Sequence, residues 1–182
     1  MGYVRDFEPS PAGLAAARAT LDLDVLSPWI LTSLFLRAVK ARVPPPAEGT
    51  PRAPRSVVVN VSSLAAVAPF ASLGPYSATR AARDMVMRVV DEEERGEGGT
   101  STLNWAPGPM DSELQRDIRC DPACHPPIRD FFTDMEAKGT WVAMDESAAL
   151  CAKVVRTEAF ASGQHLDFYD VAKAEAERAA EQ

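Results

Sequence analysis

Apolar residues near the start of the chain recur at the three- and four-residue spacing of an α-helix, over residues 10–43. Pro28 lies inside this pattern, and a proline within a helix removes a backbone donor and clashes with the preceding turn. We therefore predict one long helix bent at Pro28, or two shorter helices. The next residues, 44–54, are dense in proline and carry no large apolar side chain, which predicts an exposed loop. The apolar positions of the helical segment include Leu14, Ala17, Leu21, Leu26, Ile30, Leu31, Leu34 and Phe35.

A β-branched and almost continuously apolar run follows the loop at residues 55–61. Such a run is typical of a parallel strand that is covered on both faces, so we predict a central strand. Residues 76–94 return to helical periodicity and predict a helix, of which the acidic end at residues 91–94 is interpreted as solvated. The predicted buried stripe of this helix consists of Ala81, Ala82, Met85, Val86, Val89 and Val90.

A second short strand is predicted at residues 101–105, directly before the turn residues 106–109. A strand, a helix and a further strand in this order predict a right-handed βαβ unit. Ligands of such folds bind beyond the carboxyl ends of the strands. The chemistry is therefore expected just after Val61 and just after Trp105.

The rest of the chain predicts further alternation of helices and strands. Helices are expected around residues 127–138 and 146–156, and a last edge strand at residues 165–169. The tail, residues 171–182, favours a helix by propensity but is polar on nearly every side. The whole pattern indicates one α/β domain over residues 1–182, in which helices flank a parallel sheet.

Composition and charge exclude several classes of function. The 182 residues are 46% hydrophobic, enough for one core. Nineteen basic residues against 26 acidic ones give a net charge of −7, which disfavours nucleic acid as a partner. No uninterrupted apolar run reaches the roughly 20 residues of a membrane span, and the first residues do not resemble a secretion signal, so we expect a cytosolic protein without membrane contact.

We expect the cysteines to be reduced thiols. There are three of them, at positions 120, 124 and 151, and so small and odd a number is not typical of a disulfide framework. Cys120, Cys124 and His125 are spaced closely enough to suggest a metal site. However, the other histidine of the chain, His165, is distant in sequence, and no fourth ligand is evident. We therefore expect no metal.

Polar residues follow the first strand at the place expected for chemistry. Ser62 and Ser63 come directly after it, Tyr76 opens the next helix, and Arg80 lies one turn further on. Taken alone, the serines could cap a turn and Tyr76 could simply begin a helix. The segment NVSSLAAVAPFASLGPYSATRAARDM nevertheless resembles the active-site segment of short-chain dehydrogenases/reductases, and LNWAPGPMDSE resembles the loop after their next strand. The ending SGQHLDFYD is similar to the sepiapterin reductase branch of that family.

The resemblance implies a catalytic role for four residues. Tyr76 would donate a proton to the reduced carbonyl, and Ser63 would hold the carbonyl oxygen. Arg80 stands where the family has Lys; it would stabilise the phenolate and touch the nicotinamide ribose, although the two cations are not equivalent. Asp24 stands where the family has a catalytic Asn, and it would disfavour the phenolate unless it pairs with Arg80.

The resemblance also implies a cofactor and a substrate site. NADP(H) would contact Tyr76 and Arg80 together with Pro107, Gly108 and Met110. Asp167 and Ser63 would bind the substrate, with Asp167 in the place where sepiapterin reductases anchor a pterin.

One expected part of the family fold is missing from this sequence. None of the ten glycines is arranged as G-x-G-x-x-G after a strand, the pattern that binds a dinucleotide pyrophosphate. We therefore expect a partial Rossmann-type three-layer fold, a truncated domain that lacks the first βαβ units. Its first strand would expose an apolar edge around residues 57–59, and NADP(H) binding would be weak.

Two functions remain open. The first is an NADPH-dependent carbonyl reductase that acts on a ketone of a pterin or on a small dicarbonyl. The alternative is a non-catalytic remnant that serves as an interaction module. In either case the family resemblance implies a homodimer formed through the helices at residues 10–43 and 76–94.

Overall fold

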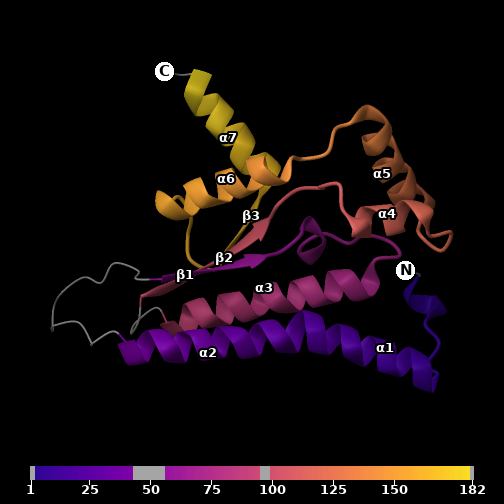
Figure 1. Ribbon diagram of the computed structural model, residues 1–182, viewed down its shortest axis with the longest axis horizontal. Helices are drawn as coiled ribbons and strands as arrows, with labels where there is room; N and C mark the ends of the chain where they lie inside the picture. Colours follow the sequence, from indigo (N-terminus) through magenta and orange to yellow (C-terminus); the bar gives the residue numbers. More distant parts are fainter. Residues whose placement is uncertain (1–2, 43–55, 95–98, 181–182) are drawn as a thin grey trace.

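The computed structural model describes residues 3–42, 56–94 and 99–180, so the predicted loop at 44–54 lies outside the described residues. It has the expected three-layer α/β fold (Figure 1). A parallel sheet in the order β1-β2-β3 has α1, α2 and α3 on one face and α6 and α7 on the other. The strands are β1 (Ser56–Val61), β2 (Thr100–Ala106) and β3 (Gln164–Asp167). The helices are α1 (Pro11–Leu21), α2 (Ser27–Arg42), α3 (Gly74–Glu94), α4 (Glu113–Cys120), α5 (Pro126–Lys138), α6 (Met144–Arg156) and α7 (Phe168–Ala180).

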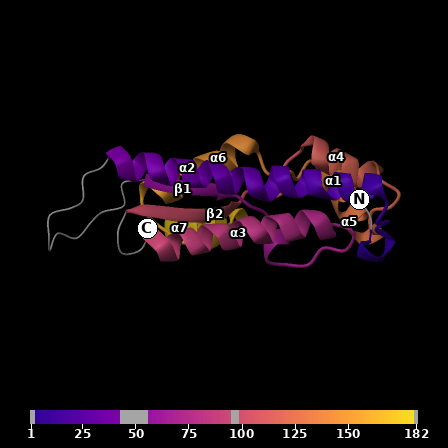
Figure 2. The same cartoon turned by 90° about the horizontal axis from the view of Figure 1, so that it is seen from below.

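The first predicted helix is continuous, and Pro28 does not divide it. Ser10 caps its start by accepting a hydrogen bond from the backbone N–H of Gly13 at 3.1 Å. A π-helical turn, Asp22–Leu26, joins α1 to α2 directly before the proline. The wider turn accommodates a residue that cannot donate to the preceding carbonyls, and the Ser27 hydroxyl donates to the Asp22 carbonyl instead. Figure 2 shows the resulting helix lying alongside α3.

The register of the sheet brings all three strand ends to one edge. Val61 pairs with Trp105, and Ala106 pairs with Asp167. Because the strands are parallel, their carboxyl ends open together onto the same side, as the sequence predicted for the site.

The apolar core lies on the α6 face of the sheet. Leu103 and Trp105 of β2 are almost fully buried there and form one cluster with Val142, Val154 and Phe168. The α3 face of the same strand carries Thr102 and Asn104, which are equally buried. Strand β2 is therefore apolar on one face and polar on the other.

The prediction that the first strand is central is wrong for the described residues, among which β1 lies at the edge of the sheet and β2 in the centre. Val59 and Val61 remain 37% and 55% exposed. This agrees with the expected apolar edge. The near-continuous apolar run predicted a strand buried on both faces, but the described residues do not cover β1 in this way.

The predicted buried stripe of α3 is only partly correct. Val90 is buried, but Met85 and Val89 are exposed, and Ala81 is exposed as well. The buried residues of the helix instead include Thr79, Asp84 and Met87; Asp84 is turned toward the polar face of β2, whereas Thr79 is turned toward Asp24. Because α3 packs on a polar face, its apolar positions did not predict which of its residues are buried.

Two smaller predictions also differ from the structure. The acidic end of α3 is not uniformly solvated, because Asp91 and Glu94 are buried and Glu94 forms an ion pair of 2.9 Å with Lys40. The tail forms a regular helix, α7, which is anchored by the buried Phe168. This helix begins at Phe168, within the strand that was predicted for residues 165–169.

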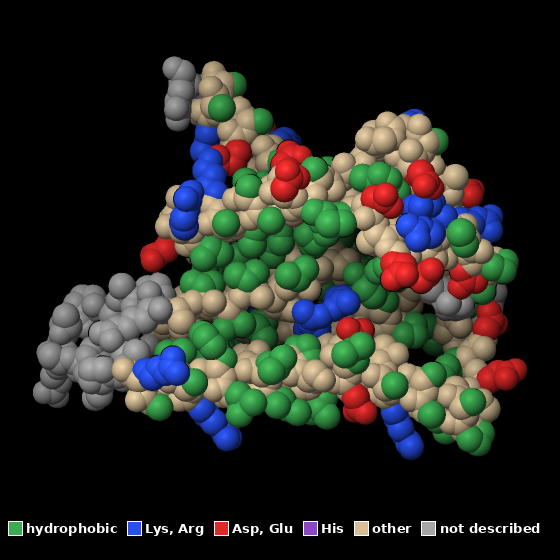
Figure 3. Space-filling model, viewed as in Figure 1, with side chains coloured by type: hydrophobic (Ala, Val, Ile, Leu, Met, Phe, Trp, Pro, Cys, Tyr) green, Lys and Arg blue, Asp and Glu red, His purple; other side chains and the backbone are tan. Residues whose placement is uncertain are grey.

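Many apolar side chains of α1 and α2 remain exposed, and Figure 3 shows them along the lower edge of the molecule. Among the described residues, the stretch Pro11–Arg42 is long and apolar enough to cross a membrane by length and composition alone. Core helices of soluble proteins and signal sequences share this length and composition. The expectation of no membrane contact relied on uninterrupted apolar runs, which do not detect such a stretch, and it stays a prediction. Exposed residues of these two helices include Leu21, Leu23, Leu26, Trp29, Ile30, Leu31 and Leu34.

Candidate active site

The three strand ends open into a cavity of about 1330 Å³. It is bounded by the start of α3, by the loop after β2, by α4 and α5, and by the first residues of the chain. Asp24 is the one predicted site residue that does not line it. The predicted site residues that do line it are Ser63, Tyr76, Arg80, Pro107, Gly108, Met110 and Asp167.

Ser63 stands at the turn that follows β1. Its backbone is extended, and its hydroxyl oxygen accepts a hydrogen bond from the Ala65 N–H at 3.2 Å, which begins a short 3-10 turn over Leu64–Ala66. The bond uses a lone pair of the oxygen, so the hydroxyl proton can be donated to a group in the cavity. The capping role considered for this serine and a role in oxygen binding are therefore compatible.

Tyr76 and Arg80 lie one turn apart on α3, and the guanidinium stacks over the phenol ring with Cζ at 4.8 Å from the ring centroid. Arg80 Nη2 is also 3.7 Å from Asp24 Oδ1, so the pairing suggested by the sequence is present. Thr79 donates a hydrogen bond of 3.4 Å to the other oxygen of the Asp24 carboxylate. Asp24 thus lies outside the cavity and offsets part of the charge of Arg80.

The stacked position of Arg80 leads to a prediction. If the site has the carbonyl-reducing role that the sequence resemblance implies, replacing Arg80 with Lys is expected to raise kcat roughly fivefold, the effect of about 1 kcal/mol. A compact ammonium can approach the phenolic oxygen more closely than a guanidinium that lies flat on the ring, and it keeps a charge for Asp24. The measurement is the pH profile of kcat for both proteins. A fall in kcat would show that this site depends on the guanidinium.

The loop after β2 is held rigidly beside the cavity. The Ser147 hydroxyl donates to the Pro107 carbonyl at 2.9 Å, and the Val142 N–H donates to the Pro109 carbonyl at the same distance. Gly108 has a φ of +78°, and a Cβ there would lie 2.8 Å from a methyl carbon of Val142. Glycine is therefore required by conformation and by space at the point where backbone groups would face a cofactor.

Asp167 ends β3 and directly precedes α7. Its Oδ1 accepts a hydrogen bond of 2.9 Å from the backbone N–H of Tyr169, whose ring also lines the cavity. Burial, with a smaller contribution from the charge of Asp167, raises the pKa of the Tyr169 phenol. Tyr169 therefore stays protonated near neutral pH and can act as a hydrogen-bond donor beside the carboxylate.

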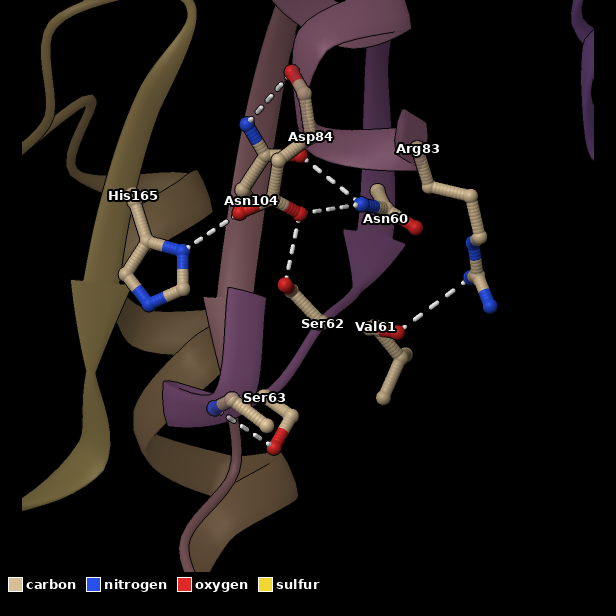
Figure 4. Close-up of polar contacts among 9 residues, drawn as sticks. Asn60, Val61, Ser62, Ser63, Arg83, Asp84, Asn104 and His165 are labelled. Atoms are coloured by element: carbon tan, nitrogen blue, oxygen red, sulfur yellow. Dashed lines mark hydrogen bonds and ion pairs between the residues drawn. The ribbon is translucent and has the colours of Figure 1, made fainter. Parts of the chain in front are cut away.

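Sequence reasoning missed a buried polar cluster directly behind these residues. Figure 4 shows Asp84 of α3 with the side chains of Asn60, Ser62 and His165 directed toward it. The signal in the sequence was a set of polar residues within otherwise strand-like or helical segments. These residues come from elements that are far apart in the sequence.

The suspected metal cluster has other contacts. His125 Nδ1 is 2.8 Å from the Tyr3 hydroxyl, and Cys124 is buried against Leu73 and Ile118. No group of three or more His, Cys, Asp or Glu residues that could hold a metal ion occurs within residues 3–42, 56–94 and 99–180.

The sequence model of the family described as short chain dehydrogenase matches residues 14–123. The chain belongs to this family. Among curated proteins, the chain is similar to the sepiapterin reductase of Xenopus tropicalis, with 39% identity over 149 residues. That match covers 81% of this chain and 51% of the relative, so the chain spans about half the length of the curated relatives it matches.

Solved structures support the same fold. A short-chain dehydrogenase/reductase from Saccharomyces cerevisiae has a TM-score of 0.72 at 21% identity, over 91% of this chain and 60% of that one. A gluconate 5-dehydrogenase from Burkholderia cenocepacia was solved in complex with NADP and tartrate. Its TM-score is 0.67 at 21% identity, over 91% of this chain and 57% of that one. The described region therefore has the same fold as the matching part of these structures.

Proposed function

We propose that this chain carries the carbonyl-reducing site of an NADPH-dependent reductase of the sepiapterin reductase type. The observation that carries the proposal is the cavity that collects Ser63, Tyr76 and Arg80 at the carboxyl ends of the strands. The similarity to sepiapterin reductases over 81% of the chain supports it. The site residues and the choice of NADPH are part of the proposal.

The arrangement of side chains suits the reduction of a ketone to an alcohol. A bound nicotinamide would supply the hydride for the carbonyl carbon. Ser63 donates a hydrogen bond to the carbonyl oxygen and orients it. Tyr76 gives its hydroxyl proton to that oxygen as the carbon–oxygen double bond becomes a single bond, and the phenolate that remains lies beside Arg80. The proton returns to Tyr76 from solvent.

The residues present fit only one end of the cofactor. Tyr76, Arg80 and the loop of Pro107, Gly108 and Met110 line the cavity and would hold a nicotinamide and its ribose. The close packing at Gly108 keeps the backbone near that position. The 182 residues contain no G-x-G-x-x-G after a strand, so pyrophosphate binding has no counterpart in this sequence.

The cavity also suggests a substrate class. Asp167 and the protonated Tyr169 place an acceptor and a donor on the side of the cavity formed by β3 and α7. A carboxylate suits an amino-substituted, guanidine-like ring edge, which a pterin provides. We propose that pterin ketones are bound through Asp167 and that small dicarbonyls react without this contact.

The test is to measure cofactor binding and turnover by the purified chain. An NADPH fluorescence titration is expected to give a Kd well above the micromolar range, because the pyrophosphate has no cradle. A Kd in the micromolar range would contradict this expectation. At millimolar NADPH, a small vicinal diketone is expected to be reduced slowly, and the absence of any reduction would contradict the proposed function.

One observation favours a second candidate, a non-catalytic interaction module. The exposed apolar side chains of α1 and α2, together with Met85 and Val89 of α3, suit a partner surface such as a second copy of the chain. Light scattering that shows a dimer, together with no turnover, would favour this candidate. A cytosolic location is part of both proposals.

A further inference from the structure

A row of polar side chains crosses all three strands just before the active site. Asn60 of β1 pairs in register with Asn104 of β2, which pairs in turn with His165 of β3. Residues in register point to the same side of a sheet, and this row faces α3. Asp84 of that helix lies over the row and is 6% exposed (Figure 4).

The Asp84 carboxylate is bonded to two strands at once. Its Oδ1 accepts hydrogen bonds from Asn60 Nδ2 at 2.9 Å and from the Ser62 hydroxyl at 2.5 Å. Its Oδ2 is 2.7 Å from His165 Nδ1. A carboxylate only accepts, so the His165 ring carries a proton on Nδ1.

The middle strand is joined to the same group. Asn60 Nδ2 also donates to Asn104 Oδ1 at 2.8 Å, and Asn104 Nδ2 donates to the Asp84 backbone carbonyl at 3.4 Å. Helix α3 is thereby connected through one residue to every strand of the described sheet.

Such a cluster contributes little to the free energy of unfolding. A buried carboxylate loses its hydration, and apolar replacements of buried charged groups are often neutral or stabilising. The hydrogen bonds within the cluster do, however, fix distances and directions that apolar packing leaves looser. A positional role therefore explains the cluster better than a role in stability.

The positions of the bonded residues show which parts would be fixed. Ser62 directly precedes Ser63, and His165 is two residues before Asp167. Asp84 follows Tyr76 by eight residues on α3. Resting on the proposed function, we propose that Asp84 is a positioning residue, which sets the oxygen-binding Ser63 and the substrate-binding Asp167 at fixed distances from the proton donor Tyr76.

The test compares Asp84→Ala with Asp91→Ala. Both carboxylates are buried on α3, but Asp91 lies two turns further on, next to Gly163, at the end of β3 remote from the cavity. In Asp84→Ala, amide hydrogen exchange is expected to become roughly tenfold faster at residues 61–65 and at 165–169 together. In Asp91→Ala, the rates at these two segments are expected to stay within about twofold of the unmodified chain.

Kinetics give a second readout. Asp84→Ala is expected to lower kcat/KM for the diketone roughly tenfold, mainly through kcat, because the reacting groups lose their alignment. Asp91→Ala should retain kcat/KM. Equal losses in the two variants, or faster exchange at neither or only one of the segments in Asp84→Ala, would overturn the proposal.

Two single-contact variants keep the proposal testable if Asp84→Ala does not fold. Ser62→Ala should loosen residues 61–65 alone, and His165→Phe should loosen residues 165–169 alone. Loosening of both segments by either variant would overturn the proposal. If the unmodified chain shows no turnover, the proposed function fails, and the exchange data by themselves decide whether Asp84 fixes the strand ends.

Discussion

Replacing Tyr76 with Phe is expected to lower kcat for diketone reduction by about 10² to 10⁴-fold, the usual contribution of a positioned general acid. The change removes only the hydroxyl group. The ring remains beneath the Arg80 guanidinium, so the stacking contact at 4.8 Å is retained. The measurement is steady-state NADPH oxidation at saturating diketone.

The stability of the Tyr76→Phe variant is the control, because it separates a loss of chemistry from a loss of folding. Because Tyr76 is only half-buried and keeps its ring contacts, the urea midpoint of unfolding should not change measurably. If the variant retains more than half of kcat, Tyr76 is not the proton donor. A large drop in the urea midpoint would instead attribute the loss of activity to unfolding.

Replacing Asp167 with Asn is expected to raise KM for a pterin ketone roughly 10- to 100-fold, because a charge-assisted hydrogen bond is worth about 1.5–3 kcal/mol. Asn keeps an oxygen that can accept from the Tyr169 N–H, so the junction of β3 and α7 is preserved. The measurement is KM for a pterin ketone and for a small diketone with the same enzyme preparation.

The two substrates serve as controls for each other in this experiment. The diketone has no guanidine-like edge, so its KM should change less than about twofold. Equal increases in both KM values would show that Asp167 supports the shape of the cavity and does not anchor a pterin.

Local sequence signals predicted the elements that position the site. The run at residues 55–61 and the turn residues after Trp105 placed two strand ends correctly, and parallel pairing then brought Ser63, Tyr76 and Gly108 to one cavity. The prediction succeeded because a βαβ unit fixes the direction of both strands once the helix between them is identified.

Other features depend on pairing across the sheet and could not be predicted. Whether residues 56–61 lie at the centre or at the edge is decided by which strand lies beside them, and the apolar pattern of β1 is the same in either case. The buried face of α3 was mispredicted for a related reason. Asp84 is buried because Asn60 and His165 lie opposite it, and these residues are far from it in sequence.

The π-helical turn at Asp22–Leu26 has a consequence for how this chain tolerates insertions and deletions. A π turn contains one residue more than an α turn. Because the extra residue is contained within the turn, deleting a single residue there would restore regular winding and would rotate the residues before it only slightly about the helix axis. Ser10 and Gly13, which line the cavity, would then keep nearly the same orientation, so the loss of one codon at this turn is expected to leave this wall of the site in place.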